Sequence, residues 1–178
     1  MIVRPALATD AAAIQTIYAH HVLHGTGTFE ETPPSVEQMT QRMADVTGRG
    51  LPWVVAEEGG KVLGYAYASP FRLRSAYRYT AEDSVYVAPG AQGRGVGRAA
   101  LTEVVAACEV LGLRQLLAVI GDSANAASIG VHRTLGFEMI GASPGLGFKQ
   151  GRFLDVVFMQ KALNGGTAGK PDADGLAL

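Results

Sequence analysis

The chain has 178 residues, of which 48% are hydrophobic and 17% charged, a composition typical of one globular domain. Its formal net charge of −1 gives no sign of a nucleic-acid-binding surface, and no apolar run reaches the roughly 18 residues of a membrane span. The first residues lack the apolar region of a signal peptide, and Cys108 is the one cysteine. We therefore expect a cytoplasmic protein in which Cys108 is a small buried hydrophobe.

The first half of the chain predicts alternating strands and helices. In chain order these are a strand over residues 2–6, a helix from Thr9 or Asp10 to about His24, a helix from 35 to about 48, and two strands over 53–58 and 61–69. Ser35 and Gln38 form the signature of a capping box at the start of the second helix. Gly59 and Gly60 predict a tight turn between the two strands.

The second half continues this alternation. We expect a polar loop, a strand over 83–89, a glycine-rich loop, a helix near 97–111, a strand over 114–121, a helix near 123–135, and two strands near 137–142 and 152–161. Residues 163–178 are rich in glycine, alanine and aspartate and show no periodicity. We expect them to form a disordered tail after one domain of residues 1–162.

The stretch AQGRGVGR, residues 91–98, places three glycines between a predicted strand and a predicted helix. Free N–H groups and the helix dipole suit such a position to an anion, and Gly93, Gly95 and Gly97 let the backbone approach it closely. Arg94 and Arg98 add positive charge, so we expect a phosphate group there. The stretch is not a P-loop, because no Gly-Lys-Ser/Thr follows.

Residues 95–100, GVGRAA, also satisfy the G-x-G-x-x-A pattern of a dinucleotide-binding fold. Three observations count against that fold. A long stretch of other structure precedes the pattern, Asp122 follows it by more than the usual ~20 residues, and too few strand–helix units remain. A dinucleotide-dependent oxidoreductase is kept as an alternative.

The segment Gln92–Gly97 resembles the pyrophosphate loop of the GNAT superfamily of acetyl-CoA-dependent N-acetyltransferases. The segment NAASIGVHRTLGF resembles the second cofactor segment of that superfamily. More closely, FRLRSAYRYTAEDSVYV, GDSANAASIGVHRTLGF and GFKQGRFLDVVFMQ are similar to its phosphinothricin and methionine sulfoximine/sulfone acetyltransferase branch. The resemblance covers about residues 2–161. It implies an α+β domain whose central mixed, mostly antiparallel sheet is flanked by helices.

The resemblance also implies where acetyl-CoA binds. The pyrophosphate would lie on the glycine loop, formed by Gln92, Gly93, Arg94, Gly95, Val96, Gly97 and Arg98. Pantetheine would lie between the strands SVYVA and RQLLAVI and pair with backbone groups of Val85, Tyr86 and Val87. Asn125, Ser128 and His132 fall on one helix face, which would border the cofactor. Asn125 is also a candidate helix cap, and Ser128 a candidate packing residue.

Two carboxylates are candidates for the base that deprotonates the acceptor amine. The resemblance favours Glu82, and its neighbour Asp83 is the competitor. His132 stands where many members of the superfamily carry a tyrosine, and the phosphinothricin-type branch has histidine there. The histidine is therefore a candidate acid, an aid to the base, or an orienting group.

The branch implies an amino-acid acceptor of the phosphinothricin, methionine sulfoximine or methionine sulfone type. Arg72 and Arg74 are candidates for binding its carboxylate, and Phe29, Tyr77 and Tyr86 for lining its pocket, together with the loop around Lys149. Surface charge and core packing are the competing interpretations of these residues. Relatives in the branch are commonly homodimers, so we expect a homodimer.

His20, His21 and His24 lie on the first predicted helix and are candidate metal ligands. His20 and His24 have the i, i+4 spacing of a metal pair, but no other ligand accompanies them, so we expect a solvated or interface-facing surface and no metal site. An acetyltransferase for another small amine or a protein N-terminus, and a non-catalytic CoA-binding module, are the further alternatives.

Overall fold

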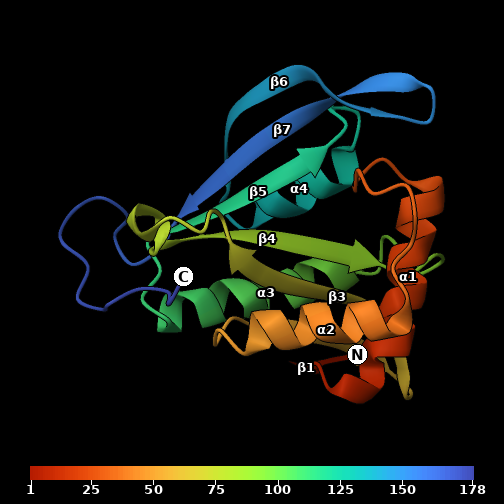
Figure 1. Ribbon diagram of the computed structural model, residues 1–178, viewed down its shortest axis with the longest axis horizontal. Coiled ribbons are helices and arrows are strands. Elements are labelled where there is room, and N and C mark those ends of the chain that lie inside the picture. The colour runs from red at the N-terminus through yellow and green to blue at the C-terminus, as the bar shows by residue number, and fades with distance from the viewer.

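The computed structural model describes all residues 1–178 and forms one seven-stranded mixed sheet with helices on both faces (Figure 1). The strands are β1 (Ile2–Pro5), β2 (Trp53–Glu58), β3 (Lys61–Pro70), β4 (Thr80–Val87), β5 (Gln115–Gly121), β6 (Glu138–Lys149) and β7 (Arg152–Ala162). The helices are α1 (Ala11–His24), α2 (Val36–Thr47), α3 (Val96–Val110) and α4 (Ala126–Thr134), with short 3-10 turns η1 (Ala8–Asp10) and η2 (Ser75–Tyr77). The expected α+β fold is confirmed. None of the helices combines the length and hydropathy needed to cross a bilayer.

The strands lie in the order β1-β2-β3-β4-β5-β7-β6, and β4 with β5 is the single parallel pair. This topology removes the dinucleotide-fold alternative, because that fold is built on a mostly parallel sheet.

The capping box at the start of α2 and the turn between β2 and β3 are both present as the sequence predicts. Gln38 N–H donates to Ser35 Oγ and Ser35 N–H donates to Gln38 Oε1, which completes the capping box. Gly59 and Gly60 have φ of 58° and 78° in the turn of the hairpin.

Side chains of β4 alternate between two hydrophobic layers. The ring of Tyr86 packs against Tyr18 of α1 at a centroid distance of 5.1 Å. Val85 and Val87 contact the start of α3 on the opposite face, around Gly97. The sheet is therefore covered by α1 and α2 on one face and by α3 and α4 on the other, so each residue of β4 can be assigned to a face.

β6 is longer than the sequence predicts. We expected a strand near 137–142, but β6 runs to Lys149 and pairs with β7 as far as Lys149↔Arg152. The glycines, serine and proline of GASPGLGF are typical of a loop, yet irregular pairing between Ser143 and Gly147 accommodates them as a bulged edge strand. This longer hairpin brings Lys149 to the end of the sheet near residue 28, to which it is hydrogen-bonded.

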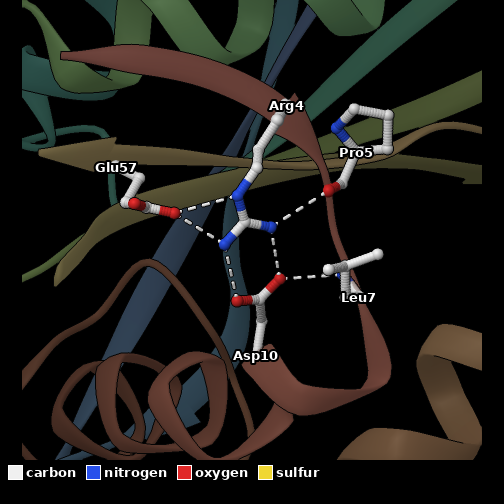
Figure 2. A network of polar contacts seen from close by, with 5 residues as sticks. All are labelled: Arg4, Pro5, Leu7, Asp10 and Glu57. Carbon is white, nitrogen blue, oxygen red and sulfur yellow. Dashed lines mark hydrogen bonds and ion pairs between the residues drawn. The ribbon is translucent and has the colours of Figure 1, made fainter. Parts of the chain in front are cut away.

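A charged network joins the N-terminal strand to the rest of the domain (Figure 2). The Arg4 guanidinium donates to both carboxylate oxygens of Asp10, at 2.7 and 2.9 Å, and to Glu57 of β2 at 2.7 and 2.9 Å. Asp10 also accepts the Leu7 N–H at 2.8 Å. The network thus ties β1, η1 and β2 together, and the hydrogen bonds from Arg4 hold the pKa of Asp10 below its ordinary value.

The C-terminal segment 163–178 forms no helix or strand and lies beside the end of the sheet at which β4 and β5 begin (Figure 1). Arg114 donates to the Gly166 carbonyl at 2.7 Å, and the Tyr79 hydroxyl donates to the Ala173 carbonyl at 2.8 Å. Leu163 is part of the core. Disorder of this segment in solution stays a prediction.

Candidate active site

The candidate active site lies where the single parallel pair of strands separates. The pairing of β4 with β5 ends at Asp83↔Ala118, although both strands continue. Figure 1 shows them diverging toward their C-terminal ends, near α1. We call this opening the gap. The resemblance predicted a separation of these two strands, and the structure contains it.

The direction of the β4 backbone decides which residues can bind a ligand in the gap. The Ala88 N–H donates to the Leu63 carbonyl at 2.8 Å, so the even-numbered residues direct their N–H and C=O groups toward β3. The odd-numbered Val85 and Val87 direct theirs into the gap. The peptide groups of Tyr86 belong to the ladder with β3, so a backbone contact from Tyr86 to the cosubstrate stays a prediction.

The glycine loop uses its glycines in two ways. Gly93 and Gly95 have φ of 73° and 79°, a left-handed backbone that other residues rarely adopt. Gly95 is the N-cap of α3, so the loop ends at the free N–H groups of a helix N-terminus. At Gly97 a Cβ atom would lie 3.3 Å from Val87 and 3.5 Å from Val85. Glycine at this position lets α3 pack closely against β4.

A cavity of about 310 Å³ connects the glycine loop with the gap. Most of the predicted cofactor-binding residues line it: Val85, Tyr86, Val87, Gln92, Gly93, Gly95, Val96, Gly97, Arg98, Asn125 and Ser128. Arg94 does not. Its guanidinium forms an ion pair with the exposed Glu58 of β2, and its contact with a phosphate stays a prediction.

The helix α4 borders the cavity opposite the glycine loop. Asn125 Oδ1 accepts the Ser128 N–H at 3.2 Å, so Asn125 caps the helix and lines the cavity at the same time. The two interpretations of Asn125 are therefore compatible. The Ser128 carbonyl accepts a hydrogen bond from His132 Nδ1 at 2.7 Å.

His132 forms a buried pair with Asp83 at the cavity wall. His132 Nε2 lies 2.8 Å from Asp83 Oδ1, and 3% and 1% of the two side chains are exposed. A carbonyl only accepts, so Nδ1 carries a proton, and one further proton is shared across the contact with Asp83. Burial lowers the pKa of His132, but the hydrogen bond and charge of Asp83, together with the bond to the Ser128 carbonyl, outweigh it, so the pKa lies above its ordinary value. Burial likewise raises the pKa of the Asp83 carboxyl, against the effect of His132.

Glu82 and Asp83 lie on opposite faces of β4. Asp83 faces α4 through its contact with His132, so the half-buried Glu82 faces the α1–α2 side together with Tyr86. Burial, reinforced by Asp83 and opposed by Arg72, raises the pKa of Glu82. Asp83 is thus hydrogen-bonded to the buried His132, whereas Glu82 faces the side on which an acceptor can bind.

Of the residues predicted to bind the acceptor, only Tyr86 lines the cavity, and the acceptor-binding role of all five stays a prediction. Arg72 and Arg74 are exposed, and the Arg72 guanidinium lies 4.6 Å from the ring centre of Phe71. Tyr77 packs edge-on against that same ring at 5.6 Å. The loop 71–79 therefore presents Arg72 beside an aromatic pair, upstream of Glu82 on the chain.

Phe29 and Lys149 fix the loop between α1 and α2 at the end of the sheet. Phe29 lies so close to Gly147 and Gly121 that a Cβ atom at either glycine would come within 3 Å of its ring. The buried Lys149 Nζ donates to the Thr28 carbonyl at 2.7 Å. This loop stays close to the gap, because Gly27 also lines the cavity.

The first-helix histidines differ from the expectation of a solvated surface. His24 is exposed, but His21 lines the cavity and its Nε2 lies 2.9 Å from the Val87 carbonyl oxygen. The signal was present in the sequence, because position 21 continues the apolar spacing of Ile14, Ile17 and Tyr18 on the buried face. Cys108 is buried as expected, and burial raises the pKa of its thiol to about 12.

A family model described as "Acetyltransferase (GNAT) family" matches residues 14–137. The chain belongs to the GNAT family of acetyltransferases. A phosphinothricin N-acetyltransferase of Alcaligenes faecalis is 53% identical over 92% of this chain and 83% of its own length. An L-methionine sulfoximine/L-methionine sulfone acetyltransferase of Salmonella typhimurium is 40% identical over 97% of this chain and 99% of its own length.

The same family accounts for the three-dimensional likeness. The crystal structure of a GNAT superfamily phosphinothricin acetyltransferase from Sinorhizobium meliloti, in complex with AcCoA, superposes with a TM-score of 0.92 and is 51% identical. The match covers 96% of this chain and 92% of that one. In this GNAT acetyltransferase the free backbone of Val85 and Val87, the helix N-terminus after Gly95 and the cavity fit an extended cosubstrate that carries phosphate.

Proposed function

We propose that this acetyltransferase transfers the acetyl group of acetyl-CoA to the α-amine of a small L-amino acid of the phosphinothricin, methionine sulfoximine or methionine sulfone type. The observation that carries the proposal is the gap: one continuous cavity runs from a helix N-terminus suited to phosphate to the unpaired edge of β4. Three relatives with the names given above support the choice of acceptor.

The cosubstrate would be held mainly by main-chain groups. The N–H groups at the start of α3 and the loop before it would bind the pyrophosphate, with Arg98 beside them. Backbone groups of Val85 and Val87 would pair with the pantetheine amides in place of β5. Acetyl-CoA supplies an activated thioester, and an N–H aimed at its carbonyl stabilises the oxyanion that forms on attack.

Glu82 is proposed as the base that removes a proton from the acceptor ammonium. A model α-amino group has a pKa of about 8, so its deprotonation near neutrality costs only about 1 kcal/mol and a single carboxylate is sufficient. The raised pKa of Glu82 brings it closer to that of the amine, which favours proton transfer. Arg72 and Arg74 are proposed to bind the acceptor carboxylate, and Phe29, Tyr77 and Tyr86 to line its pocket.

The role of His132 follows from its pairing. Both ring nitrogens are engaged, so direct proton donation to the leaving thiolate requires release of Asp83. We therefore assign the His132–Asp83 pair an electrostatic and orienting role. The two side chains share one proton, and the pair as a whole is neutral at the wall of the cosubstrate cavity.

We also propose that the enzyme is a cytoplasmic homodimer. Large apolar side chains on the edge hairpin are exposed, namely Met139, Ile140, Leu146, Phe148 and Phe153. Exposed apolar side chains on an edge hairpin favour association with a second copy. Light scattering at micromolar concentration should give twice 18.6 kDa, and a monomer would contradict this part of the proposal.

A panel of amines tests the function. Release of CoA from acetyl-CoA should be fastest with the three amino acids named above and slow with polyamines, short peptides and other small amines. Titration with NAD(P) on the same protein should show no binding. Faster release with a polyamine or a peptide would replace the amino-acid acceptor, and binding without any release would indicate a non-catalytic CoA-binding module.

A further inference from the structure

One backbone acceptor in the gap is already engaged by a side chain. Val87 directs its N–H and C=O away from β3, into the space where β5 no longer pairs. Its carbonyl oxygen lies 2.9 Å from Nε2 of His21, which stands in the last turn of α1. A helix side chain thus takes the place of the missing strand partner.

The contact defines the protonation of His21. A carbonyl only accepts, so Nε2 must carry the proton. Burial lowers the pKa of His21, and the nearby His20 and Lys149 act in the same direction, so the neutral ring with its proton on Nε2 is favoured at neutral pH. The ring is held against Tyr86 at a centroid distance of 5.4 Å, and Lys149 is itself bound to the Thr28 carbonyl.

We propose that His21 is a positioning residue for the cosubstrate: its hydrogen bond to the Val87 carbonyl fixes the end of β4, so that the Val87 N–H in the preceding peptide unit is presented to an acyl-CoA in the gap. This rests on the proposed use of acetyl-CoA. Without the bond, the Val87 carbonyl is left without a protein partner and the strand end gains freedom that binding must remove. The loss falls on affinity for CoA, before any chemistry.

The matched variants are His21→Phe, His21→Gln and His24→Phe. Phenylalanine keeps an aromatic ring against Tyr86 but has no donor, whereas the amide nitrogen of glutamine can reach the position of Nε2. His24 is exposed on the same helix and serves as the control. Calorimetry with CoA alone, without an acceptor, should give a dissociation constant about tenfold higher for His21→Phe. His21→Gln should lie within about threefold of the wild type, and His24→Phe should be unchanged.

The outcomes separate this inference from the proposed function. Wild-type CoA affinity in a folded His21→Phe, or equal losses in His21→Gln and His21→Phe, would overturn the positioning role while leaving acetyl-CoA as cosubstrate. If the wild type itself does not bind CoA, both proposals fall. A nitrogen-15 spectrum of the unliganded wild type provides a measurement that needs no variant: it should show His21 protonated at Nε2, and the Nδ1 tautomer would refute the bond.

Discussion

The buried pair between His132 and Asp83 allows its hydrogen bond and its charge to be tested separately. In Asp83→Asn the amide can donate to Nε2 of a neutral His132, whose Nδ1 still donates to the Ser128 carbonyl. The shape and both hydrogen bonds are kept, but the carboxylate that raises the pKa of His132 is gone. Burial, the largest influence, is then opposed only by the hydrogen bond to the Ser128 carbonyl, so the pKa of His132 should fall from above its ordinary value to below it.

Asp83→Ala removes the hydrogen bond as well. Breaking a buried pair by deleting one partner costs about 3–5 kcal/mol, and we expect about 3 because the Ser128 carbonyl still holds Nδ1. For a domain of this size that lowers the melting temperature by roughly 6–12 °C. Asp83→Asn should unfold within roughly 3 °C of the wild type.

Two assays decide the outcome. Thermal unfolding measures the cost of each variant, and a pH titration of the His132 ring by NMR follows its protonation. The reasoning is refuted if Asp83→Ala is as stable as the wild type, or if Asp83→Asn leaves the pKa of His132 unchanged. The pair also makes Asp83→Asn an unsuitable control for substitutions of Glu82, because it perturbs a second ionisable group.

Four further substitutions test other parts of the molecule. Glu82→Gln should lower turnover about 100-fold, with partial recovery at high pH as free amine accumulates and with an unchanged melting temperature; a loss below tenfold would exclude Glu82 as the base. In Gly95→Val the left-handed φ strains the backbone, and in Gly97→Val the new side chain pushes α3 away from β4. Each substitution should therefore raise the Michaelis constant for acetyl-CoA about tenfold or more. An unchanged constant in a folded variant would contradict the assignment of the loop to the cosubstrate. Arg4→Met should lower the free energy of unfolding by about 2 kcal/mol at neutral pH. Because Arg4 lowers the pKa of Asp10, the stability difference between variant and wild type should shrink as the pH falls through that lowered pKa. A stability difference that does not change with pH in denaturant titrations would contradict the role of Arg4.

The order of elements and the glycine loop could be predicted because their signals are local. The capping box at Ser35 and the turn at Gly59 depend on neighbours within four residues, and both are present. The length of β6 was missed for the same reason: its glycines and proline are typical of a loop, and only pairing with β7 makes the segment a strand.

The parts of the site that were missed depend on partners distant in sequence. Arg94 is paired with Glu58, and Asp83 with His132, and no spacing rule reveals either pair. The sequence could not tell which backbone groups of β4 are free, because the alternation of β4 has two phases, which only its pairing with β3 distinguishes. The apolar spacing of α1 placed His21 on the buried face, but its target at Val87 is set by the tertiary fold.

The central claim is that the acceptor is recognised as an amino acid through its free carboxylate and its oxygen-bearing side chain. Competition kinetics with methionine sulfone, methionine and the methyl ester of methionine sulfone test this most directly. We predict that the sulfone is acetylated in preference to methionine, whose thioether is only a weak acceptor, and that the ester loses roughly 30-fold or more in kcat/KM. An ester that reacts as well as the free acid would contradict recognition of the acceptor as an amino acid, and only the use of acetyl-CoA as cosubstrate would remain supported.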